Sequence, residues 1–279
     1  MPTCLSRVPL VHLMAFTSPE AIFADFFTVV PLAHALYRTA EAQRVRSSRL
    51  VRPALDLGCG SGEFVQLAVR GPIDVGLDAS LPRMSRYRRA SAYHHRCLGN
   101  ASRLPFAEGE FQTVLSVSVL EHLERPREVL AEVRRVLKPG GLFVGTATLV
   151  DMREQLFYPP LLRRVGLSPL ARLYMRLHDR LFAHCCLLSQ GEWEKMFAEA
   201  GLDLVESRKI VSPRLTRYWD ILLPFALPYR LFQEWGYSFI CRPPGVRALV
   251  QKLLLPLCRE NEDEGSSWFF VARKREGST

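Results

Sequence analysis

The sequence has no C-x-x-C pair, and its 7 cysteines are an odd number. Zinc sites and the disulfide frameworks of small secreted proteins use paired cysteines at short spacings, so neither is expected to hold this fold together. We therefore expect reduced thiols, a cytoplasmic protein and no bound metal. The adjacent Cys185 and Cys186 are interpreted as packing residues.

The chain also lacks a long hydrophobic run, an internal repeat and a low-complexity tract. No stretch reaches the ~18 apolar residues of a membrane-spanning helix. The apolar start is interrupted by Arg7, Pro9 and His12 and has no cleavage site, so no signal peptide is predicted, and Met14 is an alternative start. With 48% hydrophobic and 23% charged residues, the 279 residues are typical of a globular protein of one or two domains.

Acidic residues are outnumbered, since 37 Lys and Arg against 28 Asp and Glu leave a net charge of +9. This excess favours nucleic acid, a phosphorylated substrate or an anionic membrane surface as partner, or it serves solubility alone. The run Leu81–Arg96 carries five arginines and no acid. We interpret it as a solvated helix face and expect no nucleic-acid partner.

Apolar patterns and capping signals predict the elements. Ser18 before Pro19 begins one helix, and Pro31 begins a second. Strands at 53–57, 73–78, 93–98, 111–117 and 142–148 then alternate with helices, the last of which ends at the K-P-G-G stop signal after Leu137. A capping box at Ser189 starts a further helix, followed by strands at 202–210 and 266–275. Such alternation predicts an α/β fold with a parallel sheet and helices on both faces.

A glycine-rich turn, Gly58-x-Gly60-x-Gly62, follows the first of these strands. The dinucleotide fingerprint reads G-x-G-x-x-G, so the third glycine comes one place early. Asp78 ends the next strand, twenty residues after Gly58, where a carboxylate can accept hydrogen bonds from both ribose hydroxyls. The position between strand and helix favours an adenosine-containing ligand over a plain tight turn.

Three segments carry a resemblance to a known family: "LDLGCGSGEF", "GLDAS" and "LGNASRLPFAEGEFQTVLSVSVLEHLERPREVLAEVRRVLKPGGLFVGTAT". Together they resemble the class I S-adenosylmethionine-dependent methyltransferases, in the branch of quinone-biosynthesis and small-molecule enzymes with a type 11 methyltransferase domain. The resemblance covers residues 53–148 and 189–210. It implies a Rossmann-like seven-stranded sheet with an antiparallel last strand, and S-adenosylmethionine as the cofactor.

The resemblance also implies the residues that contact the cofactor. Asp56 and the glycines match the loop around its methionine part, Asp78 matches the ribose-binding acid, and Asn100 stands where the family usually has Asp at the adenine. Ser116, after the fourth strand, is expected near the sulfonium. The full predicted set is Asp56, Gly58, Cys59, Gly60, Gly62, Asp78, Ala79, Asn100, Ala101 and Ser116.

The division of the chain follows from these patterns. We expect an N-terminal helical cover at 1–50, the cofactor-binding core at 51–150, a helical insertion over the substrate at 151–188, and the rest of the core at 189–279 with a second apolar insertion at 212–267. Both insertions are predicted to leave the sheet at its C-terminal face. Their apolar and aromatic composition favours a hydrophobic acceptor and a water-excluding lid.

Methyl transfer chiefly requires alignment of acceptor, methyl and sulfur, and a general base only when the acceptor loses a proton early. His122, after the fourth strand, is the candidate catalytic base, with positioning of the helix as the alternative; His178 and His184 are interpreted as surface or packing residues. We predict methylation of O or C of a lipid-like, quinone-like or secondary-metabolite acceptor.

Three alternative functions stay open: methylation of RNA, methylation of protein, and binding of the cofactor without catalysis. Ser116 to Val119 replace the [DNS]-P-P-[YF] motif of enzymes that methylate base amines, which argues against that subtype. Residues 245–257 also read as an amphipathic basic helix, so contact with an anionic membrane is an alternative to a solvated basic rim.

Overall fold

The computed structural model describes residues 18–48, 50–69, 71–85, 92–231, 244–258 and 264–276. The alternative start at Met14, the arginine-rich stretch 86–91, and the centre of the second insertion at 232–243 lie outside these residues.

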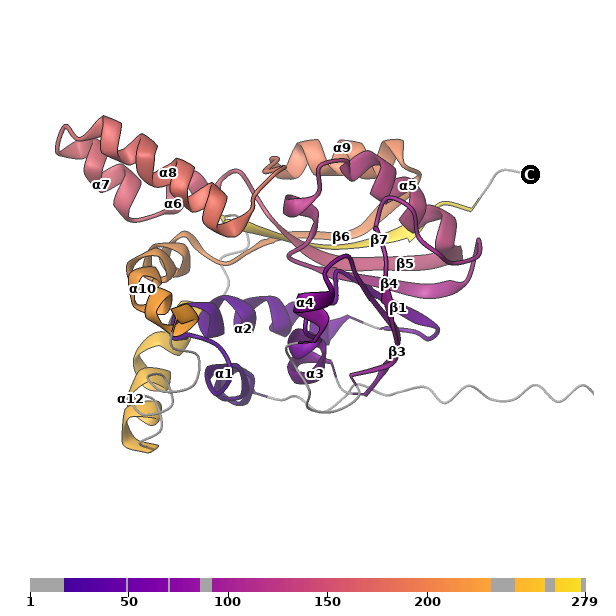
Figure 1. Cartoon of the computed structure of the whole chain (residues 1–279), viewed down its shortest axis with the longest axis horizontal. Helices are drawn as coiled ribbons and strands as arrows, with labels where there is room; N and C mark the ends of the chain where they lie inside the picture. The colour runs from indigo at the N-terminus through magenta and orange to yellow at the C-terminus, as the bar shows by residue number, and fades with distance from the viewer. Residues whose placement is uncertain are drawn as a thin grey trace, which may run out of the picture.

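A single sheet of seven strands forms the centre of the molecule (Figure 1). The strands are β1 (Ala54–Leu57), β2 (Ile73–Asp78), β3 (Tyr93–Leu98), β4 (Phe111–Val117), β5 (Leu137–Thr148), β6 (Leu202–Ile210) and β7 (Ser267–Lys274). Their order is β3-β2-β1-β4-β5-β7-β6; β1 to β5 pair in parallel, and β7 is antiparallel to β5 and β6. The predicted Rossmann-like sheet with an antiparallel last strand is therefore confirmed.

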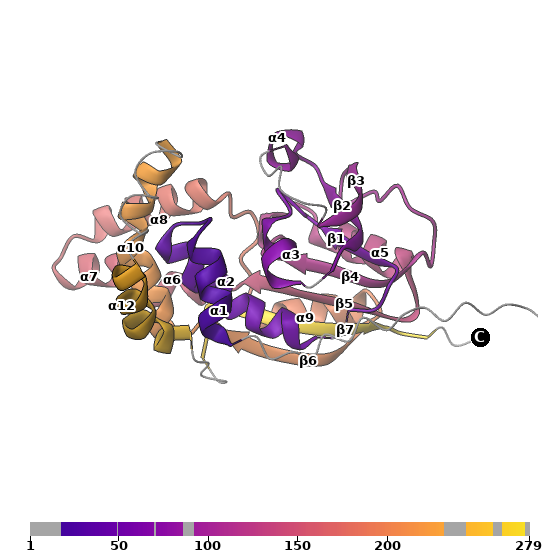
Figure 2. The ribbon, with the colours of Figure 1, turned by 90° about the horizontal axis from the view of Figure 1, so that it is seen from below.

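Helices cover both faces of this sheet (Figures 1 and 2). On one face lie α1 (Pro19–Phe27), α2 (Leu32–Ser47) and α3 (Glu63–Ala68), whose buried side chains pack on those of β1, β4 and β5. On the other lie α5 (Pro126–Val136) and α9 (Gln190–Glu199), where Trp193 and Phe197 pack with Phe143 and Phe270. Two separate apolar cores thus fix the sheet, and with it the ends of its strands.

The predicted helix starts are present. The Ser18 hydroxyl accepts a hydrogen bond from the Ala21 amide ahead of Pro19, and Pro31 directly precedes α2. Ser189 and Glu192 form the reciprocal capping box of α9. These contacts satisfy amide groups that a helix start leaves without an intrahelical partner.

The predicted stop after α5 needs a correction. The helix does end at Val136, but the K-P-G-G segment lies inside β5, which begins at Leu137, and forms no separate loop. Gly140 has a φ of +68°, and the pairing with β4 shifts between Phe111 and Thr113. Glycine allows such a bulge, so the chain passes from helix into strand without a connecting loop. Of the predicted helix after β2, the structure describes α4 (Leu81–Met84), and residues 86–91 lie outside the described residues.

Both insertions are helical and leave the sheet at one edge. Thr148 at the end of β5 and Ile210 at the end of β6 both pair with Ser267 at the start of β7. The first insertion contains α6 (Met152–Gln155), α7 (Tyr158–Arg164) and α8 (Ser168–Phe182), and the second contains α10 (Pro213–Leu231), α12 (Pro244–Leu254) and the short helix η2 (Leu255–Cys258). In both views α7 and α8 form a pair at the end of the molecule away from the C-terminus (Figures 1 and 2). Within the described ranges, no helix has the length and apolar character needed to cross a membrane.

Candidate cofactor and acceptor site

A cavity of about 430 Å³ lies at the carboxyl ends of β1, β2, β3 and β4. This is where the strand order reverses between β1 and β4, the usual ligand position in open α/β sheets. The predicted residues that line it are Asp56, Gly58, Cys59, Gly60, Asp78, Ala79, Asn100, Ala101 and His122. Nine residues from four separate segments of the chain thus meet at one opening.

The glycine turn is fixed against its neighbours. The Gly58 and Cys59 amides donate to the Leu77 carbonyl at 2.8 and 3.0 Å, which ties the turn to β2. Gly58 has a φ of +80°, and a Cβ there would lie 2.4 Å from the Val119 side chain. Only glycine fits, because any side chain would meet both backbone strain and the loop after β4.

Asp78 is 4% exposed at the end of β2. One carboxylate oxygen accepts from the Gly60 amide at 2.9 Å and the other from the Ser80 amide at 2.7 Å. The Arg83 guanidinium lies 3.6 Å away. These contacts hold the carboxylate in one orientation, and each oxygen keeps a lone pair for a ligand hydroxyl.

Asp56 is 5% exposed and accepts a hydrogen bond of 2.5 Å from the Tyr93 hydroxyl. Burial raises the pKa of Asp56 from 3.8 to about 7, although the bond from Tyr93 acts in the opposite direction. A buried carboxylate with a raised pKa favours a cationic partner. The amino group of the expected cofactor would supply one.

Asn100 lies at the mouth of the cavity after β3. Its side-chain oxygen accepts from the Ser102 amide at 2.9 Å, which fixes the turn that carries Ala101. The oxygen has a second lone pair, and the amide nitrogen has two donors. The side chain therefore keeps polar groups for a ligand ring.

Two predicted residues do not line the cavity. Gly62 precedes α3 with a φ of +84°, and a Cβ there would lie 2.8 Å from the Tyr93 ring, so its role is packing and helix start. Ser116 lies inside β4 and is fully buried. The strand continues to Val117, and the next residue, Ser118, turns toward the cavity with a φ of +52° and lines it.

A second, smaller cavity of about 130 Å³ adjoins the first. Arg38, Ser118 and His122 line both. The remaining walls of the second cavity are His34, Tyr37, Glu121, Thr148, Met152, Phe182, His184 and Trp219. They come from α2, the loop after β4, β5 and both insertions, so the cavity combines aromatic walls with a few polar groups.

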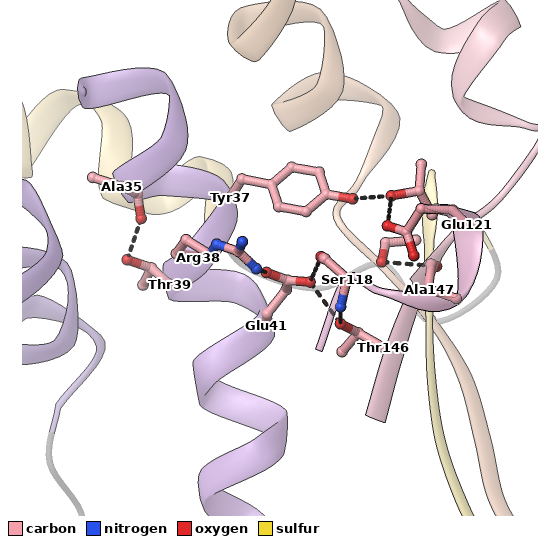
Figure 3. Close-up of polar contacts among 11 residues, drawn as sticks. Ala35, Tyr37, Arg38, Thr39, Glu41, Ser118, Glu121, Thr146 and Ala147 are labelled. Atoms are coloured by element: carbon pink, nitrogen blue, oxygen red, sulfur yellow. Dashed lines mark hydrogen bonds and ion pairs between the residues drawn. The ribbon is translucent and has the colours of Figure 1, made fainter. Parts of the chain in front are cut away.

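A network of hydrogen bonds joins α2 to the ends of β4 and β5 beneath these cavities (Figure 3). The fully buried Glu41 carboxylate accepts from the Arg38 guanidinium at 2.7 Å and from the Ser118 and Thr146 hydroxyls at 2.6 Å each. Tyr37 and Thr148 share a hydrogen bond of 3.3 Å between their hydroxyls. The network fixes Ser118, which belongs to both cavities.

Glu121 is 1% exposed and belongs to the same network. The Thr148 hydroxyl donates to its Oε1 at 2.7 Å, whereas its Oε2 has no hydrogen-bond partner (Figure 3). A buried carboxylate oxygen without a partner is costly unless a ligand or water bonds to it. Because Glu121 lines the second cavity, this oxygen can serve a polar group of a ligand there.

His122 ends the short helix η1 (Leu120–His122) between the two cavities. Its Nδ1 lies 3.1 Å from the Ala183 carbonyl oxygen, so Nδ1 carries the proton and Nε2 has the free lone pair. Its ring stacks on His184 at 5.7 Å. His178 is buried among Tyr174, Phe182 and Trp219, where burial lowers its pKa to about 4, whereas His184 lines the second cavity.

Several of these residues have no counterpart in the sequence-based set. Glu121 directly precedes His122 in "LEHL", and this adjacency is the feature of the sequence that could have identified it as a site residue. Ser118 could be found only by knowing where β4 ends. Tyr37, Arg38 and Trp219 belong to helices distant in sequence, so no local pattern connects them to the site.

Comparisons with known proteins agree with the fold. A family model described as a methyltransferase domain matches residues 55–145. The chain is 34% identical over 165 residues to an uncharacterized methyltransferase of Synechocystis sp., covering 55% of this chain and 74% of that protein. It is 28% identical over 178 residues to the ubiquinone biosynthesis O-methyltransferase of Thiobacillus denitrificans, covering 61% of this chain and 72% of that protein.

Among solved structures, the fold is similar to that of a SAM-dependent methyltransferase from Thermotoga maritima. The TM-score is 0.55 at 18% identity, over 91% of this chain and 100% of that one. At this identity, the likeness shows the shared fold.

Proposed function

Since the chain belongs to the class I S-adenosylmethionine-dependent methyltransferases, we propose that it methylates an oxygen or carbon atom of a small hydrophobic acceptor of the lipid, quinone or secondary-metabolite type. The observation that carries the proposal is the second cavity, which adjoins the cofactor cavity and has aromatic walls from Phe182 and Trp219. Among the relatives, one is named an O-methyltransferase of ubiquinone biosynthesis, which supports an oxygen acceptor.

The cofactor would occupy the larger cavity, and the residues there fit its groups. Asp78 offers lone pairs to the ribose hydroxyls, and Asp56 offers negative charge to the amino group. When bound, the cofactor supplies a methyl group already activated by positive sulfur. The protein then has to position the acceptor and exclude water.

His122 is proposed to remove the proton of a hydroxyl acceptor. Its Nδ1–H donates to the Ala183 carbonyl, which orients the ring and leaves Nε2 to accept a proton. The side chain lies at the boundary of both cavities, between the places proposed for acceptor and cofactor. A carbon acceptor with no acidic proton would need no such base.

The proposal is tested by incubating the full chain with methyl-labelled cofactor and extracts of lipids, quinones and small metabolites, followed by mass spectrometry. We expect label in an apolar small molecule, and none with Asp78→Ala. Label found only in RNA or protein would contradict the acceptor class. Cofactor binding without label in any fraction would instead indicate a non-catalytic binding protein.

We also propose that the α7–α8 pair rests on an anionic membrane, which would give access to an apolar acceptor. Its large apolar side chains are more than a third exposed, namely Leu161, Val165, Leu167, Leu170, Leu173, Leu177 and Leu181. The leucines of α8 recur three and four residues apart and so share a face, and exposed arginines accompany them at 163, 164, 172, 176 and 180. Apolar side chains beside cationic ones suit the interface of an anionic bilayer.

A further inference from the structure

A compact group of metal-ligating side chains lies at the end of α8, beside the second cavity. Within the part of the chain that the structure describes, it is the one group of three such residues whose ligand atoms all lie within 4.8 Å of one another: His178, Asp179 and His184. The His178 and His184 side chains are 3% and 5% exposed, and the Asp179 side chain is 24% exposed. The group is thus almost closed to solvent.

The ligand atoms of this group face one another at the distances of long ion pairs. Both ring nitrogens of His178, Nδ1 of His184 and Oδ1 of Asp179 make no hydrogen bond. A buried polar atom without a hydrogen-bond partner destabilises the fold, and native proteins seldom leave several together. The rings of Tyr174, Phe182, Trp219 and His184 surround His178, and Oδ1 of Asp179 lies 3.9 Å from its Nδ1.

The chain turns back sharply to build the group. Ala183, after the last residue of α8, has a φ of +51°, and the His184 amide donates to the Asp179 carbonyl at 3.0 Å. This left-handed conformation is unfavourable for a residue other than glycine. The turn places His184 against Asp179 and also directs the Ala183 carbonyl at His122.

The distances suit a small metal ion. Oδ1 of Asp179 lies 3.5 Å from Nδ1 of His184 and 3.9 Å from Nδ1 of His178. Tetrahedral zinc, with bonds of about 2.0–2.1 Å, needs ligand atoms roughly 3.4 Å apart. The three ligand atoms here all lie within 4.8 Å of one another, so the group has to close around the ion. Arg153 donates to Oδ2 of Asp179 at 2.8 Å, which orients the carboxylate and leaves Oδ1 free.

We propose that His178, Asp179 and His184 bind one divalent transition-metal ion, and that this ion fixes the end of α8 against His122. Two imidazole nitrogens with one carboxylate oxygen suit Zn²⁺, whereas Mg²⁺ and Ca²⁺ prefer oxygen ligands throughout. The absence of paired cysteines from the sequence predicted no metal. The present ligands come from a His-Asp pair and a histidine five residues after the aspartate, a spacing without a familiar motif.

The test measures bound metal and does not depend on the acceptor or on methyl transfer. The full chain, freed of any affinity tag, is exposed to Zn²⁺, desalted and analysed by mass spectrometry for metal. We expect about one zinc per chain and a higher melting temperature with zinc than with a chelator. Cobalt substituted at the site should give the visible absorption of a low-symmetry, four-coordinate ion.

His178→Phe is the informative variant, because an aromatic ring fits among Tyr174, Phe182 and Trp219 and the unpartnered nitrogens disappear. It should lose the zinc and the zinc-dependent rise in melting temperature, while its metal-free form stays at least as stable as the parent. His95→Gln changes an exposed histidine on β3 and should keep the zinc. A parent chain that retains no zinc, or a His178→Phe variant that retains as much as the parent, would overturn the proposal.

Discussion

Asp78 connects the glycine turn to the proposed ribose position, and its two oxygens already accept bonds from Gly60 and Ser80. We expect Asp78→Ala to weaken cofactor binding by about 100-fold, because two charge-assisted hydrogen bonds at roughly 1.5 kcal/mol or more each are lost. Calorimetry with the cofactor and with its demethylated product measures this. Asp74→Ala is a suitable control, since Asp74 pairs with Arg52 outside the cavity. If Asp78→Ala bound as tightly as the parent, the ribose assignment would be wrong.

Asp56 predicts a pH dependence of cofactor binding. Its pKa of about 7 in the free protein means that the carboxylate is partly protonated at neutral pH. A cationic ligand favours the ionised form, so affinity should fall as pH drops below 7, by up to about tenfold per unit, with protons released on binding. Titrations of the parent and of Asp56→Asn across this range measure the effect, and the variant should show a flat profile.

Tyr93→Phe gives a second test of how Asp56 controls the pH dependence of cofactor affinity. The Tyr93 hydroxyl lowers the pKa of Asp56, so its removal should move the fall in affinity to higher pH. The contribution of Asp56 to folding stability changes with pH in the opposite direction to its contribution to cofactor affinity. Between pH 3.8 and about 7 the folded state holds more protons on Asp56 than the unfolded state, so this residue makes the free protein less stable as pH rises. A parent whose affinity is constant below pH 7 would contradict the role of Asp56.

Helix α2 is held on the sheet by charge as well as by apolar packing. Glu41→Ala would leave the Ser118 and Thr146 hydroxyls without their acceptor and Arg38 without its partner. We expect roughly 2–4 kcal/mol less stability, because two hydroxyls lose their acceptor and the ion pair with Arg38, itself 32% exposed, is lost. The midpoint of urea unfolding measures the loss.

Glu128→Ala is the matched control for that variant. Glu128 also pairs with an arginine three residues away, but the two side chains are 51% and 70% exposed. Its loss should cost less than about 1 kcal/mol. Equal effects of the two substitutions would mean that the Glu41 network contributes no more than a surface ion pair.

Across the whole molecule, short-range patterns predicted the cofactor cavity far better than the second one. Asp56 and Asp78 lie at the carboxyl ends of β1 and β2, and Gly58 and Asn100 follow β1 and β3 within two residues. Parallel strands bring these carboxyl ends to one edge. A local motif therefore also defines their place in space. The second cavity combines α2 with two insertions, and tertiary packing that no single segment encodes brings Tyr37, His184 and Trp219 together.

The surface proposed for membrane contact also depends on the whole fold. Sequence patterning pointed to residues 245–257, where Leu249 and Leu253 of α12 are indeed exposed. The structure describes a larger exposed apolar row on α7 and α8, flanked by five arginines and at the far end from the C-terminus (Figures 1 and 2). Helical patterning alone could not distinguish these leucines from core residues, because it does not tell whether a helix face has a neighbour.

Flotation with liposomes distinguishes the two surfaces. We expect the parent to float with vesicles containing phosphatidylglycerol and to be released by high salt, because each arginine near such a surface contributes about 1 kcal/mol that salt screens. Leu173→Ser with Leu177→Ser should reduce binding at least about tenfold, since each leucine loses roughly 1.5 kcal/mol or more of apolar burial. Leu249→Ser with Leu253→Ser is the matched control and should float like the parent.

If only the Leu249→Ser, Leu253→Ser variant lost flotation, the membrane contact would lie on α12 and not on α7 and α8. A parent that never floats, and whose α7–α8 variant changes from dimer to monomer in gel filtration, would show that a second copy of the chain covers these leucines.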